Sequence, residues 1–284
     1  MILATRGSAL ALAQTEIIKK KLEALGVPVS VLPVTTKGDR NRTAPLTKIG
    51  GDGLFIRELE KKLLSKEADA AVHSGKDLPY LLSDGLLIGC VPEAADPRDC
   101  LVTLHSDKKD RELPRVIGTG SPRRISEYLA LDPEAECRNI RGNIDTRLKK
   151  LEEGEYDAIL LAAAGLDRLG IGAGRFDRRY FSAEELIPAP CQGLLAVECR
   201  ADDAGTREIL RKISDPAAEK RFAAERTLFR QMKSDCSRPV GVHAVTDGAS
   251  LTLYAMFEGK KAVRTGRYEQ LSEFCSEICG EIYK

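Results

Sequence analysis

The sequence predicts an α/β protein with two similar lobes and a small α+β domain at its carboxyl end. Strand-like residues 1–5 and 29–35 flank a helical stretch over about 9–25, which is a βαβ opening. With 284 residues, the chain is also longer than one hydrophobic core usually requires. Beyond Pro216 the alternation stops, and a helix is followed by strand-like runs and a final helix.

The elements of the first lobe each have a local signal. The first helix ends at Gly26, with Pro28 just beyond it. Residues 54–64 carry apolar side chains at helical spacing, and the short apolar run 70–72 that follows predicts a buried strand.

This strand runs into His73 and then into Lys76 and Asp77. Open α/β sheets bind ligands at the carboxyl ends of their strands. Lys76 and Asp77 are therefore expected in a loop that faces a ligand.

The second lobe repeats the pattern. Residues 116–117 run into the loop 118–121, and residues 157–161 run into 162–165. The carboxyl-terminal region predicts its own set of elements. These are helices over about 217–231 and 271–283 and two strands over 240–246 and 251–257.

Two proline-rich segments, 92–97 and 188–193, predict two crossings between the lobes, and therefore a hinge. The expected domains are 1–93 with 190–213, then 94–189, then 214–284.

Composition excludes several classes of protein. A formal net charge of +1 argues against a nucleic-acid binder, which usually carries an excess of Lys and Arg. No apolar run approaches the roughly 20 residues of a membrane span, and the first residues lack the pattern of a secretory signal. We expect a cytoplasmic protein with no nucleic-acid or membrane partner.

The eight cysteines form no C-x-x-C pair, and we interpret them as reduced thiols. Cys275 and Cys279 are one helical turn apart and are suitably spaced to share a metal, but no histidine is near them in sequence. One face of a plain helix is the favoured interpretation, and no metal is predicted.

Six arginines fall at or near predicted strand ends or the helix starts that follow them. They are Arg6, Arg123, Arg124, Arg141, Arg147 and Arg168. A guanidinium matches a carboxylate with two parallel hydrogen bonds and stays charged. Surface charge explains any single one of them, but six beside glycines and small hydroxyls indicate anion binding. The loop 118–121 also resembles a phosphate-binding loop, although no Walker or dinucleotide pattern follows it.

Lys76 and Asp77 permit three interpretations. They could form a surface turn before Pro79. The lysine could also form a Schiff base with pyridoxal phosphate, but no phosphate cup is evident. Asp77, flanked by apolar Leu78, suits a carboxylate that opposes a cation developing in a sheltered cleft.

Cys236 lies in a polar loop between the helix and the first strand of the carboxyl-terminal region. Free cysteines usually serve packing. Here Lys233 and Arg238 lie close enough in sequence to favour the thiolate, which is the nucleophilic form.

Several runs, in order and spacing, resemble the hydroxymethylbilane synthase (porphobilinogen deaminase) family over essentially the whole chain. The runs are 4–6, 54–60, 73–77, 96–99, 141–147 and 192–193. The resemblance implies two lobes like those of periplasmic binding proteins, joined by a double-crossing hinge, and a third domain that carries a dipyrromethane cofactor on Cys236 by a thioether. It also implies a monomer that joins four porphobilinogen molecules head to tail with loss of ammonia, giving hydroxymethylbilane for tetrapyrrole synthesis.

The resemblance assigns roles to single residues. It makes Asp77 the catalytic group at the pyrrole N–H groups. The implied cofactor-binding residues are Cys236, Lys76, Thr119, Ser121, Arg123, Arg124, Arg141, Asn143 and Gln192. The implied substrate-binding residues are Arg6, Ser8, Phe55, Arg147 and Arg168.

Three positions depart from the family pattern. Asp52 stands where a lysine is common, Gly75 where a larger apolar residue is frequent, and Cys191 where glycine is frequent. Asp52 puts an anion-steering role of its loop in doubt. A competing hypothesis is a two-lobed, non-catalytic module that binds a carboxylate ligand, because a fold does not settle a function.

Overall fold

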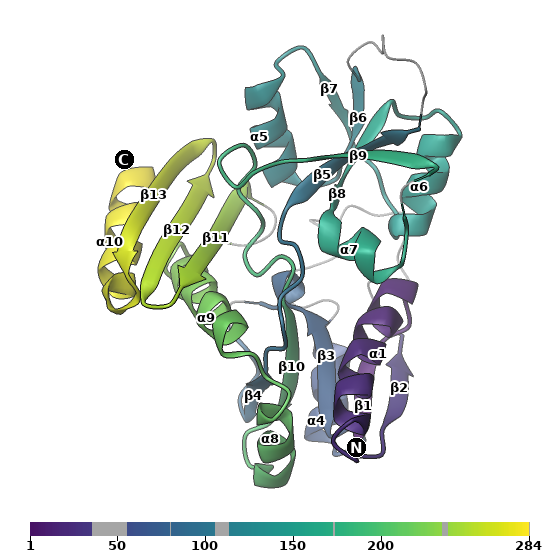
Figure 1. Ribbon diagram of the computed structural model, residues 1–284, viewed down its shortest axis with the longest axis vertical. Coiled ribbons are helices and arrows are strands. Elements are labelled where there is room, and N and C mark those ends of the chain that lie inside the picture. Colours follow the sequence, from purple (N-terminus) through teal and green to yellow (C-terminus); the bar gives the residue numbers. More distant parts are fainter. Residues whose placement is uncertain (36–55, 80, 106–113, 173, 235–237, 284) are drawn as a thin grey trace. The chain divides into compact units, whose positions relative to one another are not determined.

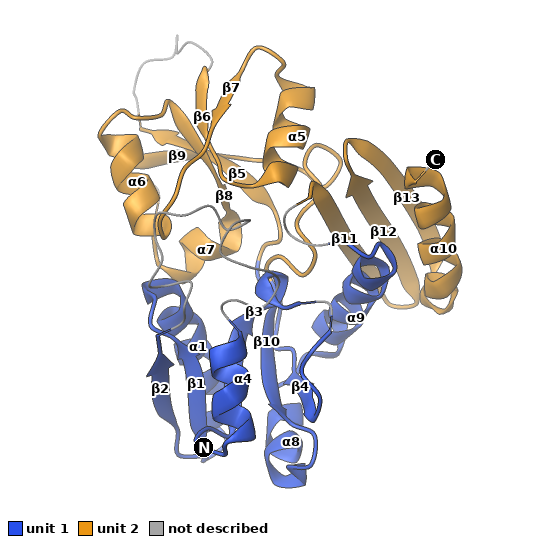
Figure 2. Ribbon diagram, turned by 180° about the vertical axis from the view of Figure 1, so that it is seen from behind, with its two compact units in different colours: residues 1–95, 194–235 blue, residues 96–193, 236–284 orange. Residues whose placement is uncertain are grey.

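The computed structural model describes residues 1–35, 56–79, 81–105, 114–172, 174–234 and 238–283 (Figure 1). The chain divides into two compact units (Figure 2). Unit 1 holds residues 1–95 and 194–235, and unit 2 holds residues 96–193 and 236–284. The chain therefore passes from one unit to the other after residues 95, 193 and 235.

Unit 1 is built on a five-stranded mixed sheet with the order β2-β1-β3-β10-β4. Its strands are β1 (Ile2–Arg6), β2 (Ser30–Val34), β3 (Ala70–Ser74), β4 (Leu86–Cys90) and β10 (Leu195–Arg200). Strands β1, β2 and β3 are parallel, as the βαβ opening predicts, and β10 runs antiparallel between β3 and β4.

Helices cover both faces of this sheet. They are α1 (Ala9–Glu23), α4 (Arg57–Leu64) and α8 (Ala204–Arg211). Unit 1 also contains α9 (Pro216–Gln231) and a short 3-10 turn η1 (Gly75–Asp77) after β3. Leu3 packs in one core cluster with α1 and α8, whereas Ala4 packs with Leu59 and Leu63 of α4. Since successive strand residues point to opposite faces, α1 and α8 lie on one side and α4 on the other.

Unit 2 repeats this plan with a sheet of order β7-β6-β8-β5-β9. Its strands are β5 (Asp99–Leu104), β6 (Val116–Gly118), β7 (Glu136–Arg138), β8 (Ala158–Ala162) and β9 (Phe176–Tyr180). Its helices are α5 (Pro122–Leu131), α6 (Ile144–Glu152) and α7 (Ala163–Arg168). Leu148 and Leu151 of α6 pack on one face and Tyr128 of α5 on the other. The predicted α/β fold class is confirmed.

The carboxyl-terminal part of unit 2 is an antiparallel sheet backed by a helix. Its elements are β11 (Val240–Asp247), β12 (Ser250–Phe257), β13 (Lys260–Arg267), the 3-10 turn η2 (Tyr268–Gln270) and α10 (Leu271–Ile282). The two strands predicted here, 240–246 and 251–257, are present as β11 and β12, and the sequence analysis missed β13, which completes a sheet of three. Its sequence, KKAVRTGR, consists mostly of charged and small residues and lacks the alternating apolar residues that mark most strands.

This carboxyl-terminal sheet is joined to residues 184–188 of the same unit. The Val242 backbone N–H donates to the Pro188 carbonyl at 2.9 Å. Lys261 Nζ donates to the carbonyls of Glu184 and Glu185, both at 2.9 Å. Helix α9, in contrast, belongs to unit 1, so the separate domain predicted over 214–284 stays a prediction.

Candidate functional site

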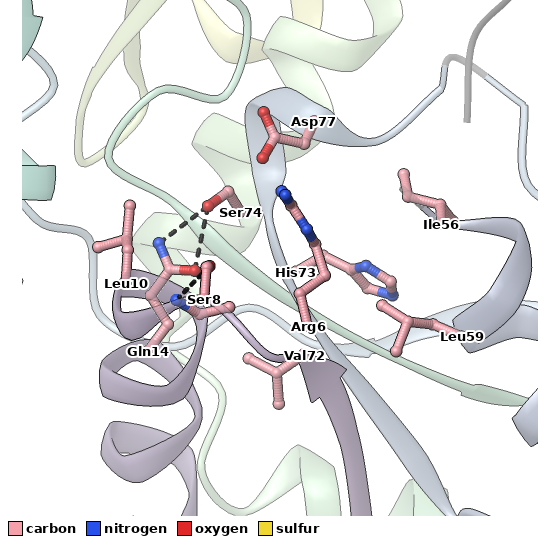
Figure 3. Close-up of a pocket in the computed structure, with 11 residues that line it drawn as sticks. Arg6, Ser8, Leu10, Gln14, Ile56, Leu59, Val72, His73, Ser74 and Asp77 are labelled. Carbon is pink, nitrogen blue, oxygen red and sulfur yellow. Dashed lines mark hydrogen bonds between the residues drawn. The ribbon is translucent and has the colours of Figure 1, made fainter. Parts of the chain in front are cut away.

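A pocket in unit 1 opens where β1 and β3 end and α1 begins (Figure 3). Three predicted site residues, Arg6, Ser8 and Asp77, line it together. Gln14 and His73 line it as well, and sequence analysis gave neither a role. The pocket therefore lies at the carboxyl ends of parallel strands, as the pattern predicted.

Arg6 and Ser8 owe their places to the βα turn. Arg6 is the last residue of β1, and Figure 3 shows its side chain extending in the direction of Asp77. Ser8 is the N-cap of α1, and its hydroxyl accepts a hydrogen bond from the Ala11 backbone N–H at 3.3 Å. A serine at this position satisfies one of the unpaired N–H groups of the first helical turn.

Asp77 ends η1, directly after β3. The turn is fixed at its start, since the Gly75 N–H donates to the Leu194 carbonyl at 2.9 Å. Ser74 is held by the Gln14 amide, whose Nε2 lies 2.8 Å and Oε1 3.1 Å from the Ser74 hydroxyl. The Asp77 side chain is exposed at the pocket edge, where its carboxylate can meet a ligand.

Unit 2 contains a buried cluster centred on Asp99. Arg123 Nη2 lies 2.6 Å from one carboxylate oxygen, and Arg124 Nη2 lies 2.7 Å from the other. The Gln192 amide donates to Asp99 at 3.0 Å. We call Asp99, Arg123, Arg124 and Gln192 the Asp99 cluster.

Two guanidinium groups of the Asp99 cluster share one carboxylate, and Arg123 also lies 3.4 Å from the Glu127 carboxylate. Burial alone would raise the pKa of Asp99, but the positive charges of Arg123 and Arg124 lower it to about 2. Arg123 also donates to the Ile187 carbonyl, and Arg124 to the Leu160 carbonyl. Three residues predicted to hold the cofactor therefore make buried contacts within unit 2, and their contact with a ligand stays a prediction.

Arg141 and Arg147 lie at the start of α6 in a different environment. Arg147 Nε donates to the Gly142 carbonyl at 2.8 Å, and no carboxylate lies within ion-pair distance among the residues that the structure describes. Burial and the positive charges of Arg124 and Arg141 lower the pKa of Arg147 to about 10. Burial and neighbouring positive charges disfavour the charged form of Arg147, so a negatively charged ligand at this position would be stabilised.

Polar caps surround these arginines. Asn143 is the N-cap of α6 and accepts hydrogen bonds from the Thr146 backbone and hydroxyl. Ser121 is the N-cap of α5, and Thr119, fully buried, accepts from the Ser121 N–H at 3.2 Å. Gly120 has no room for a side chain, because an added Cβ would lie 2.9 Å from Asn139 Oδ1. The two loops that begin α5 and α6 are therefore packed closely together.

Arg168, in the last turn of α7, resembles Arg147. Burial lowers its pKa to about 10, and Nη2 donates to the Gly193 carbonyl at 2.6 Å. The remaining predicted residues are less informative. Lys76 lies half-buried within η1, whereas Phe55, Asp52 and Cys236 fall outside the described residues.

Sequence analysis missed Asp99 and the buried pair His73–Glu198 as parts of the site's framework. Both histidine and aspartate lie in runs noted for their resemblance, 73–77 and 96–99, but no local pattern distinguishes a buried carboxylate from an exposed one. Burial arises from contacts between residues distant in sequence, such as His73 and Glu198, which are 125 positions apart.

Unit 1 therefore presents an arginine and a carboxylate at one pocket, and unit 2 separately holds arginines without a carboxylate within ion-pair distance among its described residues, so the α/β protein has groups suited to a ligand that bears carboxylates. Residues 1–208 match the family model "Porphobilinogen deaminase, dipyromethane cofactor binding domain", and residues 220–281 match "Porphobilinogen deaminase, C-terminal domain". The chain belongs to the porphobilinogen deaminase family.

Curated relatives agree with this placement. The chain is 43% identical over 273 residues to the porphobilinogen deaminase of Syntrophobacter fumaroxidans, covering 93% of this chain and 86% of the relative. It is 43% identical over 247 residues to that of Bacillus mycoides, covering 86% and 80%. Substrate binding domain 2 of Lactococcus lactis GlnP is similar in backbone, with a TM-score of 0.44 and 8% identity over 74% of this chain and 85% of that one.

The family settles the earlier choice between an enzyme and a non-catalytic binding module in favour of the enzyme. The predicted cofactor is confirmed as a class, because the matched domain is one that binds dipyrromethane. Within the described ranges, no helix has the length and apolar character needed to span a membrane.

Proposed function

We propose that this chain joins porphobilinogen molecules on a dipyrromethane held covalently at Cys236, with Asp77 as the catalytic carboxylate. It would act as a monomer in the cytoplasm. The observation that carries the proposal is the pocket of unit 1, in which Arg6 and Asp77 face one ligand site at the ends of neighbouring strands.

The residues present suit the cofactor. Each pyrrole carries an acetate and a propionate, so a growing chain gains carboxylates. Fixed cations offset the cost of taking these carboxylates out of water. Arg141, with Asn143 and the N-terminal turn of α6 beside it, would hold cofactor carboxylates, and Thr119, Ser121 and Lys76 would assist. When bound, the cofactor would supply the terminal pyrrole to which the first new unit is joined.

Asp77 would stabilise the positive charge that develops on the substrate during the reaction. When a porphobilinogen molecule loses ammonia from its aminomethyl carbon, that carbon and its pyrrole become cationic, and the carboxylate stabilises this charge until a carbon–carbon bond forms. Arg6, Ser8, Arg147 and Arg168 would bind the acetate and propionate of the incoming molecule, and Phe55 would lie over the pyrroles. Arg147 and Arg168 support this role because each has a lowered pKa and a backbone carbonyl as its contact.

The test of Asp77 is a charge deletion. Asp77→Asn keeps the shape and one hydrogen-bond acceptor, so cofactor and substrate should still bind. Loss of one preorganised electrostatic group costs about 10²–10³ in rate. In single-turnover mixing followed by native mass spectrometry, wild-type protein should add one to four pyrrole units while Asp77→Asn stalls near the start. A mutant that elongates at the wild-type rate would remove Asp77 from catalysis.

The attachment point has a separate test. Cys236→Ser should give protein at the mass of its sequence, without colour in acidic Ehrlich reagent. Cys191→Ser is the matched control, and it should keep the added mass of two pyrroles. Colour that persists in Cys236→Ser would place the thioether on another cysteine.

A further inference from the structure

His73, which lines the pocket of unit 1, forms a buried ionisable pair with Glu198. Imidazole Nε2 and carboxylate Oε2 are 3.0 Å apart, and their side chains are 3% and 0% exposed. The two residues come from neighbouring antiparallel strands, since Ala196 pairs with His73 and Glu198 with Ala71. Among the described residues, His73 is the ionisable group within ion-pair distance of Glu198.

The pair lies on the face of the sheet that α4 covers. Ala71 and Glu198 are a cross-strand pair, and Ala71 packs with Leu59 and Leu63 of α4. Figure 3 shows the His73 ring on the side of Ile56 and Leu59, below the turn that leads to Asp77. Arg6 is on this face too, since it is two residues beyond Ala4 of the same cluster.

Stability does not account for this pair. Replacing a buried polar pair with apolar residues of the same volume often leaves stability unchanged or raises it. Glu198 Oε1 has no hydrogen-bond partner among the described residues, which adds a desolvation cost. Arg200, two residues along β10, offers no relief because its guanidinium contacts the Leu63 and Ala68 carbonyls and Asp203.

The pair lies at the end of β3, directly before the turn that carries Asp77. His73 is followed by Ser74, which Gln14 holds, and by Gly75, which the Leu194 carbonyl holds. The carboxylate of Glu198 restrains the imidazole, and the imidazole restrains the last residues of β3. These contacts together set the direction in which η1 leaves the strand, and η1 ends at Asp77.

We propose that His73 and Glu198 are positioning residues for Asp77, an inference that rests on the catalytic role proposed for that carboxylate. Neither would touch the reacting atoms. A misplacement of about 1 Å is enough to cost about 10²-fold in rate. The pair would thus be retained for the placement of one charge, at some expense of stability.

The first experiment replaces the pair in the cofactor-loaded enzyme with apolar residues, as His73→Phe with Glu198→Leu. The expected result is a kcat about 10²-fold lower, a KM for porphobilinogen within about twofold of wild type and an unchanged cofactor mass. The thermal midpoint should equal or exceed that of wild type. A kcat close to wild type would overturn the inference, and so would a lower midpoint accompanied by cofactor loss, which indicates a merely structural pair.

A matched control and a milder variant keep the test decisive if the double replacement folds poorly. Arg221 and Glu225 form another buried pair in unit 1, 2.8 Å apart within α9, and Arg221→Met with Glu225→Leu should leave kcat unchanged. Glu198→Gln keeps the shape and a hydrogen bond to His73, so it should recover most of the lost kcat. A rate for Glu198→Gln as low as that of the apolar pair would contradict positioning by hydrogen bond.

A double-mutant cycle separates this inference from the proposed function. His73→Gln should slow wild-type enzyme but have little further effect in Asp77→Asn, because it acts through Asp77. Equal slowing in both backgrounds overturns the positioning role and leaves Asp77 as the catalytic group. A wild-type rate for Asp77→Asn alone overturns the proposed role of Asp77 itself.

Discussion

The Asp99 cluster and the start of α6 place the same side chain, arginine, in opposite environments within unit 2. Arg123 and Arg124 are buried against a carboxylate whose pKa falls to about 2. Arg147 has a backbone carbonyl as its contact, and its own pKa falls to about 10. An arginine whose charge is already balanced supports the fold, whereas one that is desolvated beside other cations is prepared for an anion.

The largest expected effect tests the structural side of this comparison. Asp99→Leu leaves the buried Arg124 guanidinium without its carboxylate and leaves Arg123 with Glu127 alone, and breaking a buried pair costs about 3–5 kcal/mol. Urea denaturation should show this loss in the free energy of unfolding. A loss below about 1 kcal/mol would mean that solvent or a ligand reaches the cluster, and the comparison would fail.

The second prediction tests the ligand-binding side. Arg147→Leu should weaken porphobilinogen addition by about 1.5–3 kcal/mol, the contribution of a charged hydrogen bond, while cofactor retention changes little. Its stability at pH 7 should equal or exceed wild type, because the lowered pKa means that the fold disfavours the charged form below about pH 10.

Arg123→Leu is the contrasting variant to Arg147→Leu. It should impair both folding and cofactor assembly, since it removes contacts to Asp99 and to the Ile187 carbonyl. Intact mass and thermal midpoint measure the two effects. Equal consequences for Arg123→Leu and Arg147→Leu would erase the distinction between the two regions.

The third prediction concerns acid. The pKa of Asp99 is lowered from 3.8 to about 2, so its contribution to stability is present above about pH 4 and is lost as the pH falls toward 2. The shift corresponds to about 2 kcal/mol. Compared by denaturation at several pH values, wild type and Asp99→Asn should converge in stability over this window. A constant gap would show that the charge of Asp99 is not what stabilises the cluster.

The smallest effect is expected beside Gln192. Cys191 adopts φ of 61°, in the left-handed region where a side chain costs about 1 kcal/mol, and it is buried. Cys191→Gly relieves this strain but loses apolar packing and adds chain entropy, so stability should change by less than about 1 kcal/mol. Cys191→Val, which is branched at Cβ, should cost more, and equal thermal midpoints would show that strain is absent.

Local patterns predicted much of the fold because they reflect local physics. The βαβ opening, the helix over 54–64 and the strand before His73 follow from apolar spacing and from Gly26 at a helix end. Strand β13 was missed because most of its side chains are charged or small. The pairing of a strand with its neighbours, not its own composition, made it a strand.

The candidate site was predictable as a set of residues but not as a set of roles. Spacing brought Arg6, Ser8 and Asp77 to one edge, because parallel strands end together. Spacing could not show that Arg123 and Arg124 share Asp99, which packing across unit 2 decides. The structure also explains one departure from the family pattern, because the backbone conformation at Cys191 is one that favours glycine.

The bond between β13 and residues 184–188 has a consequence for how the protein is made. Lys261 joins the Glu184 and Glu185 carbonyls and lies 3.2 Å from Glu127, which also accepts from the Ile187 N–H. A ribosome adds about 5–20 residues per second, so these groups wait on the order of seconds for their partner to emerge. Unit 2 therefore completes these contacts late in synthesis, after unit 1 has received its described strands, and Glu127 waits for a lysine more than a hundred residues further along the chain.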